Sequence, residues 1–170
     1  MKTAKLIIDG KEIEIQINEE QLKQLCPQKK KTGYERAEFG EYYWRINDTG
    51  LPSNSITEGN GYYDTDLYKS ANYYSDKTIA ENNARADKLM RQLRRFAVEH
   101  RKKNLDWNNA DSMKYLLKYN HKSRGLTIDY AYSYKSLGVI YFNTKETAQL
   151  AIDAFKDELL WYFKEYKDSL

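Results

Sequence analysis

The sequence predicts an α+β fold in which an antiparallel sheet is covered by two long helices, with a β-hairpin and a short helix at the N-terminus. Three observations favour this class. Short runs alternate apolar and polar residues, two long stretches have apolar residues at helical spacing, and two similar passages each open one of those helices. The similar passages predict an internal β…βα repeat whose two copies contribute to one sheet.

Residues 1–33 are expected to form a small module with its linker. Strands at 6–8 and 13–17 flank an Asp-Gly dipeptide, which favours the tight turn of a β-hairpin because it tolerates positive φ. Asn18 then has the character of a helix N-cap, since acidic residues and a short apolar stripe follow it. The module is therefore predicted to be a hairpin followed by a short helix.

Residues 34–104 form the first predicted repeat. An aromatic strand at 42–46 is followed by a polar stretch at 48–61 without periodicity, which is expected to be a long loop. A long helix is predicted over 76–104, with its apolar residues at heptad-like spacing and facing the sheet. These residues are Ile79, Ala86, Met90, Leu93, Ala97 and His100.

Residues 105–170 form the second predicted repeat, with strands at 113–119 and 126–134 joined by a turn. Asn143 is expected to cap a helix that runs to about Tyr166. Alternation in the second strand predicts that Tyr130, Tyr132 and Tyr134 pack against a helix. The two helix starts align at one constant offset, pairing Tyr73 with Tyr141, Ser75 with Asn143, Lys77 with Lys145 and Ala80 with Ala148.

The formal charge of +3 is unevenly distributed along the chain. Residues 34–75 contain seven acidic and three basic side chains, whereas residues 76–104 contain nine basic and four acidic ones. Cations in rows along a helix suit a phosphate backbone, so this helix is a candidate nucleic-acid-binding element. Its candidate residues are Arg85, Lys88, Arg91, Arg94, Arg95 and Arg101. The alternatives are a solvated face that pairs with the acidic segment, and a face that binds an acidic protein surface.

The sixteen tyrosines are a second unusual feature of the composition. Tyrosine brings a large contact area and a hydrogen-bonding tip at low entropic cost, and it is therefore enriched at binding surfaces. The tyrosines expected in a polar loop, where packing does not explain them, are the better candidates for partner contacts. This group comprises Tyr62, Tyr63 and Tyr68, together with the neighbouring Asp64 and Asp66.

No group of residues predicts catalysis, a cofactor or a metal site. Cys26 precedes a proline and has no histidine close in sequence, and the two histidines, His100 and His121, are isolated from each other. The acidic run of Asp64 and Asp66, with Glu58 upstream, is the one grouping that suits a divalent cation, and a bare pair of this kind is weakly specific. We therefore expect a protein that is not an enzyme.

Composition also bears on the compartment. No apolar run approaches the roughly 18 residues of a membrane-spanning helix, so no membrane partner is expected. The single cysteine excludes an intramolecular disulfide and favours a reducing compartment, which for this chain predicts the cytoplasm.

Several passages resemble small accessory proteins of Firmicutes prophages and integrative elements. They are the opening run KLIIDGKEIEIQINEEQLKQL, the aromatic strand 42–46, the helix start 72–76, the Trp-Asn-Asn sequence at 107–109 and the strand end 138–142. Some proteins of this size and setting are anti-CRISPR proteins, which block Cas nucleases by binding them or their nucleic-acid-contacting surfaces. The resemblance implies a phage or mobile-element protein that acts in the cytoplasm of its bacterial host, and it transfers no functional residues.

Three hypotheses follow for function. The first is a non-catalytic inhibitor of a host defence nuclease, most plausibly an anti-CRISPR protein that occludes the type II nuclease Cas9 or its guide complex. The second is a direct DNA- or RNA-binding accessory protein that uses the basic helix 76–104. The third is a homodimer in which that helix pairs with its copy through the heptad-like stripe.

Overall fold

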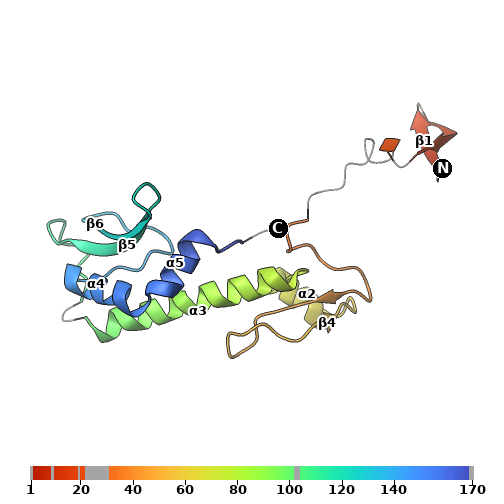
Figure 1. Ribbon diagram of the computed structural model, residues 1–170. Helices are drawn as coiled ribbons and strands as arrows, with labels where there is room; N and C mark the ends of the chain where they lie inside the picture. The colour runs from red at the N-terminus through yellow and green to blue at the C-terminus, as the bar shows by residue number, and fades with distance from the viewer. Residues whose placement is uncertain (1, 9, 19, 22–30, 102–103, 169–170) are drawn as a thin grey trace. The chain divides into compact units, whose positions relative to one another are not determined.

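The computed structural model describes residues 2–8, 10–18, 20–21, 31–101 and 104–168 (Figure 1). The chain divides into two compact units, Met1–Thr32 and Gly33–Leu170. The described residues form four helices and three separate two-stranded antiparallel sheets, which makes the protein α+β. The predicted class is therefore confirmed, whereas the prediction of one shared sheet is wrong.

The first unit contains the predicted hairpin. Strands β1 (Lys2–Ile8) and β2 (Lys11–Ile17) pair antiparallel, and the register places Ile8 opposite Lys11 across a two-residue turn. Gly10 adopts a φ of 77°, the left-handed conformation that this turn requires and that glycine tolerates.

The helix predicted after the hairpin begins where it was expected. The Asn18 side chain accepts a hydrogen bond from the backbone N–H of Gln21 at 2.8 Å, and the Gln21 side chain accepts one from the N–H of Asn18 at 3.0 Å. This reciprocal pair is a capping box, which satisfies two backbone donors at the helix start. The remaining residues of this predicted helix, and Cys26, lie outside the described residues.

The second unit begins with short elements. Strand β3 (Tyr42–Tyr43) pairs with β4 (Ile56–Thr57), so the stretch predicted as a loop returns to the sheet. Helix α2 (Tyr62–Lys69) follows, and the prediction of a loop there is wrong. The helix is stabilised at its start by Asp64, whose carboxylate accepts a hydrogen bond from the backbone N–H of Gly61 at 3.0 Å.

The long helix α3 (Lys77–Glu99) begins at Asp76, whose carboxylate accepts a hydrogen bond from the N–H of Ile79 at 3.0 Å. His100 is the C-cap residue that follows the helix. Its side chain is exposed, so the prediction that it faces the core is wrong. The His100 ring instead stacks on Phe96 with the ring centroids 3.8 Å apart. The buried residues of α3 are Ile79, Ala80, Ala84, Ala86, Leu89, Leu93 and Ala97.

Strands β5 (Lys114–Asn120) and β6 (Gly125–Ala131) form the second predicted hairpin. Because β6 ends at Ala131, Tyr132 and Tyr134 lie beyond it, and both are exposed together with Tyr130. The prediction that these three tyrosines pack against a helix is therefore wrong.

Two short helices replace the single helix expected at the C-terminus. Helix α4 (Lys145–Ala154) and helix α5 (Lys156–Lys164) are separated at Phe155, where φ is −121°. The Phe155 ring contacts Phe96 of α3 edge-on, with the centroids 5.5 Å apart, so the break turns an aromatic side chain inward. The N-cap of α4 is Thr144 and not Asn143.

The largest apolar core joins α3, α4, α5 and the β5–β6 hairpin. It contains Leu89, Leu93, Ala97, Phe142, Ala148, Ala151, Ile152 and Leu159. Figure 1 shows α4, α5 and the hairpin on one side of α3. Four residues of the predicted stripe, Ile79, Ala86, Leu93 and Ala97, are buried within the chain. The pairing of two copies through this stripe stays a prediction.

The residues that precede α3 and α4 have similar local structure. Tyr74 forms an isolated antiparallel bridge with Trp44, and Phe142 forms one with Tyr115. Each bridge precedes an N-cap residue, Asp76 in the first case and Thr144 in the second. The internal repeat beyond these few residues remains a prediction.

Candidate functional site

The cations of α3 fall on the side of the helix that faces away from the core. Lys88, Arg91 and Arg95 are exposed, and their spacing places them on neighbouring turns along one edge. The core residues Leu89 and Leu93 occupy the opposite side. The outer face of α3 is therefore rich in cations, and it also carries the exposed acidic residues Asp87 and Glu99.

A loop from the N-terminal part of the unit borders this surface and creates a hollow of about 520 Å³. We call it the first basic hollow, and it is lined by Thr49, Leu51, Lys88, Arg91, Gln92 and Arg95. Its lining includes three cations and no acidic side chain. The Gln92 amide supplies a further hydrogen-bond donor, so the hollow suits an anion with several oxygen acceptors.

The bordering loop is a tight turn built around Asn47. The Asn47 side chain accepts hydrogen bonds from the Thr49 backbone N–H at 3.0 Å and from its hydroxyl at 2.7 Å. Gly50 adopts a φ of 79°, and the Arg91 guanidinium lies against it. Glycine therefore allows the positive φ of the turn.

Arg85 differs from the other predicted nucleic-acid contacts. Its guanidinium donates two hydrogen bonds to Glu158 of α5, at 2.8 and 3.0 Å, and lies 4.0 Å from the ring centroid of Trp161. These bonds also lower the pKa of the Glu158 carboxyl. Arg85 thus joins α3 to α5, and its guanidinium is engaged within the protein.

The remaining cations form few ion pairs, although acidic side chains lie near two of them: Arg91 lines a neighbouring hollow with Asp48 and Asp87, and Lys88 lines one with Glu158. Within the described part of the chain, Lys88, Arg91 and Arg94 form no ion pair, and Arg95 has only a 3.8 Å contact with the exposed Glu99. Arg101 lies beyond the end of α3 and donates a hydrogen bond to Asn104 at 3.4 Å. Among the described residues, no ion pair joins the basic helix to the acidic segment 34–75, as the alternative interpretation would require.

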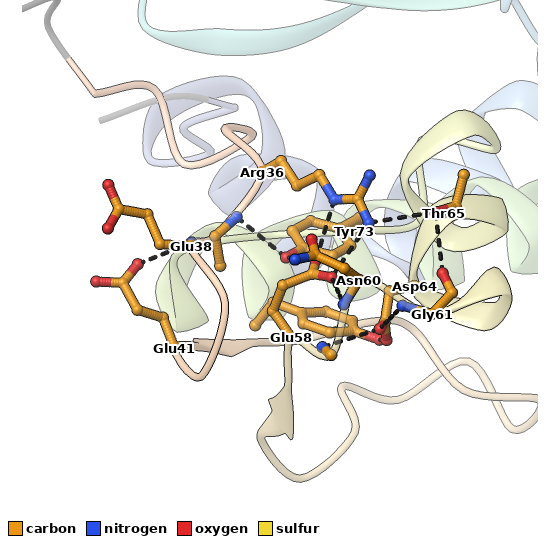
Figure 2. A network of polar contacts seen from close by, with 12 residues as sticks. Arg36, Glu38, Glu41, Glu58, Asn60, Gly61, Asp64, Thr65 and Tyr73 are labelled. Carbon is orange, nitrogen blue, oxygen red and sulfur yellow. Dashed lines mark hydrogen bonds and ion pairs between the residues drawn. The ribbon is translucent and has the colours of Figure 1, made fainter.

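Two acids of that segment are instead used internally (Figure 2). Glu58 is fully buried and accepts two hydrogen bonds from the Arg36 guanidinium, at 3.2 and 3.1 Å. It also accepts the Tyr73 hydroxyl and the Asn60 backbone N–H, each at 2.7 Å. The Arg36 bonds, followed by that of Tyr73, hold the pKa of Glu58 below its usual range despite burial.

Asp64 belongs to the same network. Its carboxylate accepts the Tyr43 hydroxyl at 2.7 Å and the backbone N–H groups of Gly59 and Gly61 at 3.0 Å each. The Tyr43 bond is the main reason that the pKa of Asp64 is lowered. Asp64 was a candidate for partner contacts, but it is buried and its oxygens are occupied, so its position indicates a structural role.

The other candidate partner contacts lie on α2. Tyr62 is 85% exposed and Tyr63 is 53% exposed, and Asp66 is also exposed. Tyr68 is less free, because its ring contacts Tyr73 edge-on with the centroids 5.5 Å apart. The tyrosines at the start of α2 are therefore the aromatic side chains of this group that face solvent.

Two kinds of feature are absent from the described residues. Across the described ranges, no cluster of three or more His, Cys, Asp or Glu side chains has a metal-binding arrangement. The helices in these same ranges are all too short or too polar to span a bilayer.

Three residues that matter for the first basic hollow were not predicted from the sequence. Thr49 and Leu51 border it only because the 47–52 loop folds against α3, and Gln92 is an uncharged residue of α3 itself. No residue spacing along the chain signals that approach, although a glycine within a polar turn is compatible with it.

No protein-family model matches the chain, and neither a similar curated protein nor a similar solved structure is found.

Proposed function

We propose that the protein binds nucleic acid by placing phosphate groups against the outer face of α3. The observation that carries this proposal is the first basic hollow, in which Lys88, Arg91 and Arg95 converge without an acidic neighbour in the lining. Lysine and arginine are the side chains that most often contact phosphates, and arginine can hold two phosphate oxygens at once. A phosphodiester backbone fits this chemistry because it repeats the same anionic group along its length.

The expected binding is electrostatic and largely independent of sequence. Each phosphate neutralised by a cation releases counterions, so the affinity falls with salt by a logarithmic slope of about 0.9 per contact on a duplex. Three such contacts correspond to roughly a 40-fold loss of affinity between about 50 and 200 mM salt. Backbone contacts of this kind fix the position of the protein without distinguishing bases.

The test compares two double variants of equal charge. In Arg91→Glu with Arg95→Glu, both changes lie in the first basic hollow, whereas Lys122→Glu with Lys164→Glu changes exposed residues of the β5–β6 turn and of α5. Binding of labelled DNA and RNA is measured by fluorescence anisotropy at low salt. We expect the first variant to lose at least about tenfold in affinity and the second to bind like the wild type.

Two results would overturn the proposal. One is the absence of measurable binding to any nucleic acid by the wild-type protein at low salt. The other is an equal loss of affinity in both double variants, because net charge and not the hollow would then explain the binding. Circular dichroism of each variant shows whether its fold is retained.

A second candidate function is inhibition of a host defence nuclease, with Cas9 as the target that the prophage resemblance favours. The observation that favours it is the exposure of Tyr62 and Tyr63 beside Asp66 on α2. Aromatic side chains that protrude into solvent suit a pocket on a partner protein, and an acidic neighbour suits a cationic nucleic-acid channel. Occlusion of such a channel in the bacterial cytoplasm would need no catalytic group.

This candidate is tested with the purified nuclease and its guide. Wild-type protein in excess is expected to slow target cleavage, and Tyr62→Ala with Tyr63→Ala is expected to restore it. The matched control is Tyr134→Ala, which removes an equally exposed tyrosine from the connection after β6. Unchanged cleavage in the presence of the wild-type protein would exclude this function for the nuclease tested.

A further inference from the structure

A second group of cations lies on the other flank of the outer face of α3. Arg94 and Lys135 line a hollow of about 380 Å³ together with Ser136, Leu137, Gly138 and Val139. We call it the second basic hollow. Its lining again includes no acidic side chain, and neither Arg94 nor Lys135 forms an ion pair with another described residue. Lys135 belongs to none of the motifs found in the sequence.

The segment that carries Lys135 is held in place by aromatic contacts. The Lys135 ammonium lies 5.7 Å from the ring centroid of Trp107, and Trp107 contacts Tyr141 edge-on at 4.9 Å. The backbone N–H of Ser136 donates to the Tyr141 hydroxyl at 2.9 Å. The second basic hollow is therefore a supported feature of the fold and not the chance position of one long side chain.

The two hollows lie on opposite flanks of one helix. Helical geometry places Lys88 and Arg94 about 120° apart around the axis and about 9 Å apart along it. A loop before α2 borders the first hollow, and the connection after β6 borders the second. Val98 lies on the strip between the flanks and is 59% exposed, although it is apolar.

From this arrangement we infer that the protein binds double-helical DNA, with α3 directed into the major groove and one phosphodiester strand at each hollow. The inference rests on the proposed function and specifies its ligand. A helix with its side chains is about 10–12 Å across, and the major groove of B-form DNA is about 12 Å wide. A single-stranded nucleic acid has only one phosphodiester backbone, so it cannot contact both flanks of α3 at the same position along the helix axis.

Two further observations fit a DNA duplex. The exposed Val98 lies where the helix faces the groove floor, and thymine methyl groups are the apolar contacts available there. The major groove of an RNA duplex is deep and too narrow for a helix, so double-stranded RNA does not match this arrangement. The cations on the two flanks account for the strand backbones and leave the ridge between them for the bases. That ridge carries Val98 and also the exposed Asp87, whose carboxylate can accept a hydrogen bond from the amino group of cytosine in the major groove.

The test compares the affinities of one sequence as a DNA duplex, as single-stranded DNA and as an RNA duplex, at equal salt. We expect the wild-type protein to prefer the DNA duplex by about tenfold or more. Arg94→Glu with Lys135→Glu is expected to weaken duplex DNA binding about tenfold and to change single-strand binding less than about twofold. Lys122→Glu with Lys164→Glu again controls for net charge.

The results separate this inference from the proposed function. Equal affinity for single-stranded and duplex DNA, a preference for the RNA duplex, or an unchanged duplex affinity in the Arg94 and Lys135 variant each overturns the inference while nucleic-acid binding stands. Absence of all nucleic-acid binding overturns the proposed function itself. Thermal unfolding of each variant, followed by circular dichroism, establishes that an altered affinity comes from a folded protein.

Discussion

The parts of the second unit that precede and follow α3 are stabilised in different ways. Before α3, two ionised carboxylates, Glu58 and Asp64, are buried among hydrogen-bond donors. The apolar cluster where this part meets the start of α3 has three buried members. After α3, the chain packs Phe142 and the residues of α4 and α5 into a larger apolar core. The first part depends on satisfying buried polar groups, whereas the second depends on removing apolar surface from water.

This difference follows from the elements available to each part. Strands of two residues and a helix of eight provide little apolar surface, so a polar network connects the segments before α3. The hairpin of seven-residue strands after α3 presents a continuous apolar face to the helices. Mutations should therefore act through different mechanisms in the two parts.

The largest effect is expected in the apolar core. Phe142→Ala should lower the free energy of unfolding by about 3–5 kcal/mol, because it removes a buried ring and leaves a cavity. Urea denaturation measures this change. The control Leu137→Ala alters a fully exposed side chain and should shift stability by no more than about 0.5 kcal/mol. Similar losses in both variants would contradict the assignment of the core.

The next largest effect is expected in the polar network. Glu58→Gln keeps the shape of the side chain but removes the charge that faces Arg36, and it should cost about 2–3 kcal/mol. The matched control is Glu38→Gln, which changes an exposed glutamate of the same part. If the two variants are equally stable in denaturant, the network contributes nothing specific.

A smaller effect tests the second carboxylate. Tyr43→Phe removes the hydroxyl that donates to Asp64 and should lower stability by about 1–2 kcal/mol. Tyr42→Phe removes the hydroxyl of the neighbouring exposed residue and should have almost no effect. A result in which Tyr43→Phe matches this control would show that the Asp64 bond to Tyr43 is dispensable.

The pH dependence of stability distinguishes the part before α3 from the part after it, because among the described residues only the first contains buried carboxylates whose pKa values are lowered. The pKa values of Glu58 and Asp64 are lowered in the folded state, so their stabilisation is fully present above the ordinary carboxyl pKa and is lost as the pH falls through the lowered values. One carboxylate contributes at most about 1.4 kcal/mol per pH unit. Glu58→Gln should flatten the acid limb of a stability–pH curve, and Phe142→Ala should leave its slope unchanged. An unaltered limb in Glu58→Gln would contradict the lowered pKa.

The sequence was most informative where a local rule decides the structure. Alternation and turn residues predicted both hairpins, and the apolar stripe predicted the course of α3. Helix α2 was missed because its residues Tyr62–Lys69 show no apolar stripe and its start depends on the tertiary bonds of Asp64. The break at Phe155 likewise depends on a contact with α3 that the sequence does not display.

The candidate site was predictable to a similar extent. Charge counting identified Lys88, Arg91, Arg94 and Arg95, since helical spacing alone places them outside the core. It also included Arg85, whose partner Glu158 lies far along the chain. Lys135 and Thr49 lie in loops that border the two basic hollows, and no sequence pattern determines where these loops pack against α3.

The central claim is that the cations of both basic hollows contact phosphates. Its most direct test is the slope of log affinity against log salt for duplex DNA. Contacts from Lys88, Arg91, Arg94, Arg95 and Lys135 predict a slope of about −4.5, and Lys88→Ala should reduce its magnitude by about 0.9. A slope near zero, or the same slope in Lys88→Ala as in the wild type, would contradict the claim.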